Sequence, residues 1–283
     1  MKKIVSLILA LALMCGFVVA LASCGEAEPV VKVVDIALSE EEYAFCVNKS
    51  DDTLKTAVND FLKKIKTDGT FDSICNNYFG DGTPLAITSA ALDNSKDQLV
   101  VATSTGFEPF EMVDANGKYS GIDLEIAYYL AKELNKELVI QDMQFEAVVN
   151  SVESGTCDIG MAGLSVTPDR QKVVNFSDSY YNASQVLIVK ADDTTFDSCK
   201  TKADVEAILN ALTSSTKIGC QKGTTGELYL DGDEDYGFPG LKATKMSYDY
   251  AALAVTAMTN GNVDYVIVDN GPAKAITATV NGD

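Results

Sequence analysis

The chain of 283 residues contains no histidine and no tryptophan, and Arg170 is its only arginine. Without histidine, nucleophilic catalysis of the Ser-His-Asp or Cys-His type is impossible in its usual form. Zinc and iron sites that rely on histidine are excluded for the same reason. We therefore expect no metal site.

Positive charge is also scarce, because 22 lysine and arginine residues face 41 aspartate and glutamate residues. The net charge of −19 argues against nucleic acid as a partner, since the phosphate backbone binds basic surfaces. Apolar residues still make up 47% of the chain, which is enough to build a full core. The composition predicts an acidic globular protein that does not bind nucleic acid.

Cysteine spacing indicates neither a disulfide framework nor a metal cluster. No CxxC pair occurs, and setting aside Cys15 and Cys24 at the N-terminus leaves an odd number. The cysteines that remain are Cys46, Cys75, Cys157, Cys199 and Cys220. We interpret most of them as small buried hydrophobic side chains, and a pairing of Cys199 stays open.

Residues 1–23 have the pattern of an export signal. A basic start at Lys2 and Lys3 precedes an almost unbroken apolar run over 4–20. The next residues, 21–24, resemble a bacterial lipobox, in which Cys24 is lipidated and becomes the mature N-terminus. An ordinary signal peptide or a transmembrane anchor is the alternative. No later apolar run approaches the roughly 20 residues that span a membrane. We therefore expect a soluble, extracytoplasmic body that a lipid anchors to the cell membrane.

Strand-like and helix-like segments alternate along the rest of the chain. The expected strands are 99–102, 137–140, 158–162, 185–190, 216–220 and 264–268. The expected helices are 51–66, 122–134, 147–153, 201–212, 248–259 and 271–277. Ser50 is a candidate cap of the first helix, and Thr201-x-x-Asp204 and Thr224-x-x-Glu227 resemble capping boxes. Two α/β units in series predict two lobes with mainly parallel sheets.

Arg170 stands out within the stretch 161–178. Lysine supplies every other basic residue, so a lone guanidinium suggests a task that lysine performs poorly. That task is flat, two-pronged hydrogen bonding to a carboxylate or a phosphate. On the count alone, a structural arginine that pairs with Asp178 or Asp158 is an equal alternative.

Several stretches resemble the extracytoplasmic solute-binding proteins of amino-acid ABC importers, which have the two-lobed type II periplasmic-binding fold. The stretches are 102–111, 117–123, 161–178, 223–226 and 263–269. The resemblance implies an α/β protein whose two lobes are joined by two hinge strands, 43–47 and 185–190. It also implies a monomer, without catalytic residues and without a cofactor, that captures a free L-amino acid by hinge closure and delivers it to the membrane subunits of an ABC permease.

The order of the matching stretches differs from that of the family. Residues 40–49 and 66–80 resemble the family's C-terminal end, yet here they precede its N-terminal start. We interpret the chain as a circular permutant, which is tolerated when the joined ends are close and the cut lies in a loop. A truncated protein behind an unrelated N-terminal segment is the alternative.

The permuted reading predicts the domain organisation. Residues 1–23 form the signal peptide, and lobe 2 combines 29–38 with 191–283. Lobe 1 covers 39–190, and its parts are the displaced segment 39–80, the linker 81–97 and the family's N-terminal part 98–190.

The resemblance implies a ligand site that draws on both lobes. Arg170 would hold the carboxylate of an amino acid bidentately, with added backbone N–H groups from Ser165 and Thr225. Helix N-termini supply such free donors. Asp269 would take the ammonium group, helped by the Gly163 carbonyl and the Ser165 hydroxyl. Its alternative is a solvated or capping carboxylate, although the carboxyl end of a strand is where α/β sheets bind ligands.

The side chain of the ligand would meet a second set of residues. Phe107 and Phe145 would sandwich it by apolar contact, although either residue could equally be plain core. Ser104 and Gln221 fall where the family tunes specificity for the side chain.

The residue at position 104 indicates the class of ligand. Family members that bind basic ligands tend to carry an acid where this chain has Ser104, although Asp123 and Glu108 could still supply negative charge. We therefore expect a neutral polar amino acid such as glutamine. Two rival functions remain: a dehydratase of aromatic precursors, which shares this fold, and a module that passes ligand occupancy to a membrane receptor.

We predict that Cys24→Ser abolishes lipid attachment, because only the thiol can carry the lipid. The variant should be released from membranes or remain as unprocessed precursor, as judged by membrane fractionation and the mass of the N-terminal peptide. A variant that stays membrane-bound with normal cleavage would contradict the lipobox.

Overall fold

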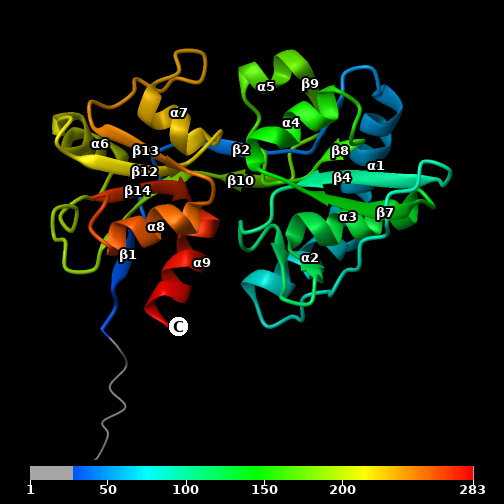
Figure 1. The fold of residues 1–283 in the computed structure, drawn as a ribbon, viewed down its shortest axis with the longest axis horizontal. Helices are drawn as coiled ribbons and strands as arrows, with labels where there is room; N and C mark the ends of the chain where they lie inside the picture. The colour runs from blue at the N-terminus through cyan, green and yellow to red at the C-terminus, as the bar shows by residue number, and fades with distance from the viewer. Residues whose placement is uncertain (1–27, 283) are drawn as a thin grey trace, which may run out of the picture.

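Two lobes, each built on a five-stranded sheet, make up residues 28–282, the part that this computed structural model describes (Figure 1). The sheet of lobe 1 contains, in spatial order, β7 (Glu137–Asp142), β4 (Gln98–Thr103), β8 (Ile159–Gly160), β3 (Cys46–Asn48) and β9 (Val174–Phe176). The sheet of lobe 2 contains β1 (Val31–Val34), β11 (Gln185–Lys190), β14 (Tyr265–Asp269), β12 (Lys217–Gln221) and β13 (Thr244–Tyr248). The predicted alternation of strands and helices is confirmed.

Helices cover both faces of the sheets, as α3 and α4 do in lobe 1 (Figure 1). The helices of lobe 1 are α1 (Asp52–Asp68), α2 (Thr70–Phe79), α3 (Ile122–Glu133), α4 (Phe145–Glu153) and α5 (Pro168–Val173). Those of lobe 2 are α6 (Lys202–Ala211), α7 (Thr225–Asp231), α8 (Ala251–Thr259) and α9 (Asn270–Asn281). A small hairpin of β5 (Met112–Val113) and β6 (Tyr119–Ser120) precedes α3.

Each sheet combines parallel and antiparallel strands. In lobe 1, β4 runs parallel to β7 and β8, whereas β3 is antiparallel to both β8 and β9. In lobe 2, β12 runs parallel to β13 and β14, whereas β11 is antiparallel to β1 and β14. The parallel strands end at the side that faces the other lobe, so their carboxyl ends are brought to the boundary between the lobes.

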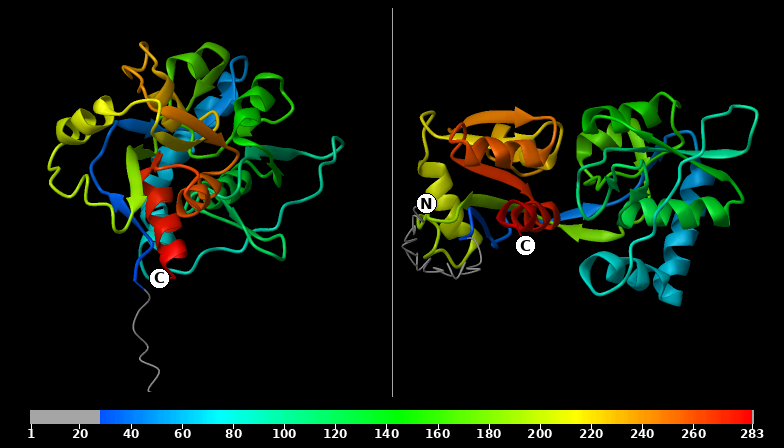
Figure 2. Two further views of the ribbon diagram at one scale, coloured as in Figure 1. Left: turned by 60° about the vertical axis from the view of Figure 1, so that its left-hand side comes forward. Right: turned by 60° about the horizontal axis from the view of Figure 1, so that its bottom comes forward.

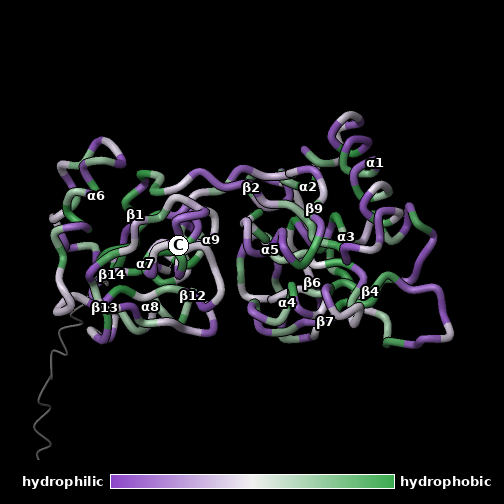
Figure 3. The backbone as a smooth tube through the Cα atoms, turned by 90° about the horizontal axis from the view of Figure 1, so that it is seen from above, coloured by the Kyte–Doolittle hydropathy of each residue, from purple (hydrophilic) through white to green (hydrophobic). Residues whose placement is uncertain are grey.

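Helix α1 confirms the helix expected at 51–66 and buries one apolar face, and Figure 3 shows apolar and polar residues alternating along it. Its buried side chains are Val58, Phe61, Leu62 and Ile65. The predicted cap Ser50 is wrong, because the Asp51 carboxylate accepts the Leu54 amide at 2.9 Å. The Ser50 hydroxyl instead donates to the Asn48 side chain.

Two other helix starts test the sequence reading. The capping box at Thr201 and Asp204 is present, with both reciprocal hydrogen bonds. Helix α8 begins at Ala251 rather than at the predicted residue 248. The reason is that Tyr248 ends strand β13, where its carbonyl accepts the Lys222 amide.

The N-terminal part of the described chain is divided between the lobes. Strand β1 lies at the edge of the lobe 2 sheet, whereas β3 is inserted between β8 and β9 of lobe 1. Helices α1 and α2 pack against α3. The contact includes a hydrogen bond from the Tyr78 hydroxyl to the Glu125 carboxylate at 2.6 Å.

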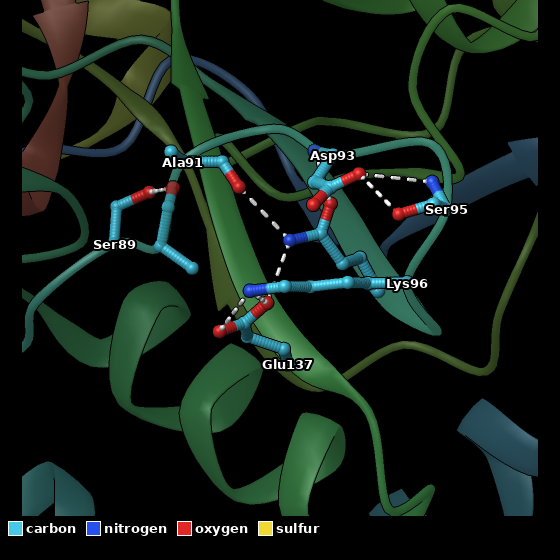
Figure 4. Close-up of polar contacts among 8 residues, drawn as sticks. Ser89, Ala91, Asp93, Ser95, Lys96 and Glu137 are labelled. Carbon is cyan, nitrogen blue, oxygen red and sulfur yellow. Dashed lines mark hydrogen bonds and ion pairs between the residues drawn. The ribbon is translucent and has the colours of Figure 1, made fainter.

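Residues 81–97, predicted to be a linker, contain no helix, but they are fixed to lobe 1. Ile87 is buried and exchanges backbone hydrogen bonds with Tyr119. At the far end, the Gln98 amide donates to the Ala91 carbonyl and to the Glu137 carboxylate, and Lys96 pairs with the same carboxylate (Figure 4). The connection between α2 and β4 is therefore held in place at several points.

Two short strands cross between the lobes and pair with each other: β2 (Glu41–Tyr43) and β10 (Tyr181–Ala183), antiparallel and midway in Figure 1. The predicted hinge strands 43–47 and 185–190 are placed too far along the chain. Residues 185–190 form β11 inside the lobe 2 sheet, so the expected lobe boundary at 190 moves to before Gln185. The apolar residues throughout 185–190 are typical of a strand in a sheet interior, and the hinge role that the resemblance implied for this strand is wrong.

The two ends of the described chain meet on lobe 2. The Asn281 side chain, at the end of α9, accepts the amides of Val30 and Val31 at 2.8 and 3.1 Å and donates to the Val31 carbonyl at 3.0 Å. Figure 2 shows α9 beside the first strand from two further directions.

The predicted behaviour of the cysteines is confirmed for the residues that the structure describes. All five are free, and four are buried: Cys46, Cys157, Cys199 and Cys220. No helix within 28–282 is both long and apolar enough to cross a membrane. The predicted signal peptide, 1–23, and the predicted lipidation site, Cys24, lie outside the described residues.

Candidate ligand-binding site

The loops that follow the parallel strands of the two lobes enclose a small cavity. Seven residues singled out from the sequence line it: Phe107, Phe145, Gly163, Ser165, Arg170, Thr225 and Asp269. Thr224 is the further lining residue. The volume of about 10 Å³ has room for about one water molecule. The structure is therefore a closed form, and anything larger could enter only after the lobes part.

The fold explains why these side chains meet. Phe107 follows the carboxyl end of β4, the loop with Gly163 and Ser165 follows β8, and Asp269 is the last residue of β14. In parallel α/β sheets the carboxyl ends of adjacent strands form the usual ligand crevice. Here the crevices of two sheets face each other.

Arg170 binds main-chain carbonyls of both lobes. Its Nη1 donates to the Ser165 carbonyl at 2.7 Å, and its Nη2 donates to the Gly223 carbonyl at 2.9 Å. The guanidinium lies over the Phe145 ring, 5.2 Å from the ring centroid. Burial lowers the pKa of Arg170, and no acidic side chain of residues 28–282 forms a salt bridge with it. The pairing with Asp178 or Asp158 is not found, and N–H donors remain for a ligand.

Asp269 is buried and faces the cavity from lobe 2. Its Oδ1 accepts the hydroxyl of Tyr43 at 2.5 Å. Burial, and then the negative charge of Glu41, raise the pKa of Asp269 to about 7. A carboxyl group in this state favours a cation beside it, because a positive charge would offset both effects.

Asp123 supports the cavity from behind and does not line it. Its carboxylate accepts the Gly163 amide at 2.9 Å and the Tyr180 hydroxyl at 2.5 Å. Burial raises its pKa to about 7. Gly163 has φ 55°, and an added Cβ would lie 2.8 Å from the Phe107 ring, so only glycine fits this turn. Glu108 is exposed and lies outside this cavity.

The start of α7 differs from the predicted capping box. The Thr224 hydroxyl donates to the Gln221 carbonyl at 2.8 Å, and the Glu227 carboxylate accepts the Gly223 amide rather than that of Thr224. Thr224 is the N-cap by position but makes no side-chain cap. The box fails because the hydroxyl turns back to the preceding strand.

The two predicted tuning residues do not line the cavity. Ser104 is buried at 2% exposure, and its hydroxyl has no hydrogen-bond partner within the described residues. Gln221 is buried at the end of β12. Both flank the site, and neither closes it.

Glu41 and Tyr43 reach the site from the crossing strand β2, and the sequence assigned neither of them a role in ligand binding, placing Tyr43 only in a hinge strand. Glu41 accepts the Ser165 and Thr225 hydroxyls, each at 2.6 Å. In the structure Glu41 and Tyr43 are buried whereas Glu40 and Glu42 are exposed, but the run of three glutamates gives no such alternation in the sequence. A period of two identifies the inner face of a strand.

No cluster of three or more potential ligands among the described residues could hold a metal ion. The polar groups at the site are the Arg170 guanidinium, the carboxyl groups of Asp269 and Glu41, hydroxyls and backbone dipoles. Such a set can bind a small molecule that carries both charges.

The sequence profile of the family described as "Bacterial extracellular solute-binding proteins, family 3" matches residues 99–231. The ABC transporter arginine-binding protein 1 of Escherichia coli (strain K12) is 29% identical over 188 residues, which are 66% of this chain and 67% of that protein. The match to a second relative that is named for arginine binding covers only 43% of that relative's length.

Two solved structures are similar over most of their length. One is the ancestral amino acid-binding protein AncCDT-1, described as a precursor of cyclohexadienyl dehydratase, with 31% identity and a TM-score of 0.55 over 64% of this chain and 75% of that chain. The other is an ancestral arginine-binding protein bound to glutamine, with 30% identity and a TM-score of 0.53 over 65% and 74%. These matches confirm the predicted two-lobed α/β fold of type II.

The raised pKa of Asp269 predicts how the stability of the unliganded protein depends on pH. Because the folded state raises this pKa from 3.8 to about 7, the contribution of Asp269 is fully present below about pH 4 and is lost as the pH rises through 7. In urea unfolding, the unfolding free energy of the wild type should fall between pH 4 and pH 8. The fall should be smaller in Asp269→Asn, by on the order of 3 kcal/mol. Asp192→Asn, at an exposed site, should keep the wild-type slope. An unchanged slope in Asp269→Asn would contradict the assignment.

Proposed function

The chain belongs to the bacterial extracellular solute-binding proteins of family 3, and we propose that it captures a free L-amino acid between its lobes for an ABC importer. The observation that carries the proposal is the convergence of Arg170, Ser165, Thr225 and Asp269 from two lobes on one closed cavity. The protein would act as a monomer, held outside the cytoplasm by a lipid on Cys24. It would hand its ligand to the membrane subunits of a permease.

The carboxylate of the ligand would bind Arg170. The guanidinium uses two of its five N–H groups on the Ser165 and Gly223 carbonyls, so the others can grip a carboxylate in the plane of the fork. Backbone N–H groups of Ser165 and Thr225 would add to this grip. The ammonium of the ligand would bind Asp269, with the Gly163 carbonyl and the Ser165 hydroxyl beside it.

Hinge motion about β2 and β10 would admit the ligand. The closed form has contacts across the cleft, such as Gln144 Nε2 to the Tyr250 hydroxyl at 3.2 Å. Others lie at the cavity itself, such as Arg170 to the Gly223 carbonyl at 2.9 Å, and opening would break them as well. Ligand contacts on both lobes would then favour closure, because the ligand binds the closed form more tightly than the open form.

The side chain of the ligand has two candidate classes. The lack of an acid at Ser104 favours a neutral polar side chain such as that of glutamine, and a neighbouring structure is bound to glutamine. The curated relatives named for arginine favour a cationic side chain. Phe107 and Phe145 would contact either kind by apolar packing, Ser104 and Gln221 would tune the choice, and a thermal-shift screen of the twenty amino acids would identify the ligand. A ligand at 100 times its Kd should stabilise the protein by about 2.7 kcal/mol.

A dehydratase is the second candidate function, since one structural neighbour is described as a precursor of cyclohexadienyl dehydratase. Asp269, with a pKa raised to about 7, is the cavity group best suited to move a proton. Turnover of prephenate or arogenate would establish this activity. Stabilisation by an amino acid without turnover would support binding instead.

We also propose that the chain is a circular permutant of its family. Three observations support the proposal: β3 lies inside the lobe 1 sheet, residues 81–97 join α2 to β4, and Asn281 binds Val30 and Val31. Family members would continue from the end of α9 into a strand such as β1. The contact at Asn281 is where that continuation would run.

A reconnected chain should test the permutation. It would start near Asp97, join the present ends and finish near Gly80. We expect it to fold and to bind the ligand of the wild type with similar affinity in calorimetric titration. If the reconnected chain unfolds or loses the ligand, then the present order is essential and the segment 39–80 is no displaced tail.

Arg170 should carry the recognition of the ligand carboxylate. Charge-assisted hydrogen bonds contribute about 1.5–3 kcal/mol each, so Arg170→Ala should weaken binding on the order of a hundredfold or more. Arg170→Lys should not restore it, because an ammonium lacks the planar fork. Calorimetry with the ligand from the screen measures both, and Lys172→Ala, an exposed neighbour, is the control.

The same calorimetric titrations can test Asp269, the expected partner of the ligand ammonium. Asp269→Asn should also weaken binding, and analogues without a free ammonium should lose this sensitivity. Near-normal affinity in Arg170→Ala, with an unchanged circular dichroism spectrum, would reduce the arginine to a structural residue.

A further inference from the structure

Glu41 is an acidic residue at the point where the two lobes meet. It lies on the crossing strand β2 and is 4% exposed. Its Oε2 accepts the Ser165 hydroxyl of lobe 1 and the Thr225 hydroxyl of lobe 2, each at 2.6 Å. Its Oε1 accepts the Ser39 hydroxyl at 2.6 Å. A single carboxylate oxygen therefore joins residues of both lobes, and both residues line the cavity.

The hydrogen-bond network fixes the direction of these hydroxyls. Thr225 Oγ1 accepts the Gln185 side-chain amide at 3.0 Å and donates to Glu41. Ser165 Oγ also gives its proton to Glu41, so its lone pairs remain for another donor. A hydroxyl in this state can accept from an ammonium but cannot donate to a carboxylate. Glu41 thus orients the Ser165 hydroxyl toward the positive end of a ligand.

The charges around the closed cavity do not balance. With Asp269 ionised beside the ammonium of a ligand, Glu41 and Asp269 would face Arg170 as the only basic partner lining the cavity, and no lysine or arginine within 28–282 forms a salt bridge with either acid. A neutral amino acid adds one positive and one negative group and leaves one negative charge uncompensated. An amino acid with a cationic side chain removes the excess. Uncompensated charge in a closed site is costly, because little water reaches it.

We propose that Glu41 is a positioning residue that makes the site select cationic over neutral amino acids, an inference that rests on the proposed function. The negative charge expected at the Ser104 position would come instead from the crossing strand. Glu41 would act through the orientation of Ser165 and Thr225 and through its own charge. It would remain bonded to the protein in the liganded form.

The test compares ligands of the same shape and different charge. L-arginine and L-citrulline have nearly the same shape and differ by one positive charge, whereas L-lysine and L-norleucine form a looser second pair, because norleucine lacks the terminal ammonium group altogether. In calorimetric titration the wild type should bind the cation of at least one pair about tenfold or more tightly than its neutral partner. This is the order expected for one full charge acting through a partly hydrated interior.

Glu41→Gln keeps the shape of the side chain and removes its charge. The variant should lose most of the preference for the cation, mainly through weaker binding of the cation. Glu42→Gln is the matched control, because Glu42 is the next residue of the same strand but is exposed. The control should keep the wild-type preference. Thermal unfolding would confirm that both variants fold.

Each outcome decides a different point. Equal binding of the cation and its neutral partner by the wild type overturns the charge selection, whatever the fate of Glu41→Gln. A preference that survives in Glu41→Gln overturns the role of Glu41. If the screen finds only uncharged ligands, the selectivity proposal fails while the proposed function stands. If no amino acid binds, the proposed function itself fails.

Discussion

The pairing of β2 with β10 is the constraint on which the rest of the structure depends. These strands of three residues each carry both crossings between the lobes. Their register places Glu41 and Tyr43 on the inner face, where they reach Ser165, Thr225 and Asp269. The segment about which the lobes turn therefore also holds residues that form hydrogen bonds with the lining of the site. Closure and recognition share the same few hydrogen bonds.

The closed, unliganded site is polar and tightly bonded, but its charges are not matched. Arg170 is held by two carbonyls, which carry only partial negative charge. Asp269 accepts the Tyr43 hydroxyl, and burial raises its pKa. A zwitterion supplies the missing partner of each group at once. The protein thus gains most from a ligand that brings both charges in a fixed geometry.

Much of the fold and of the site follows from local patterns. The face of α1, the capping box at Thr201 and the strands before Ser165 and Asp269 depend on short-range periodicity and on the rule for strand ends. The roles of the seven predicted residues that line the cavity are implied by the family resemblance, and local patterns alone do not give them. A single guanidinium among lysines draws attention to Arg170, but the count leaves a structural role equally open, and the resemblance assigns the ligand role.

What the sequence missed depends on tertiary packing. Glu41 lies within a run of three glutamates, and only pairing with β10 determines which one turns inward. The wrong cap at Ser50 arises because the neighbouring Asp51 is an equally good capping residue, whereas the hinge at 185–190 is implied by the resemblance and is overturned by the sheet order. The absent capping box at Thr224 reflects a competing acceptor, the Gln221 carbonyl, from the adjacent strand.

The contact of Asn281 with Val30 and Val31 has a mechanical consequence. Both ends of the described chain leave from one corner of lobe 2, so a pulling force on either end enters the molecule there. The load would pass through β1 and α9 and bypass the crossing strands. Lobe 1 would carry none of the load, and tension on the two ends would not open the cleft between the lobes.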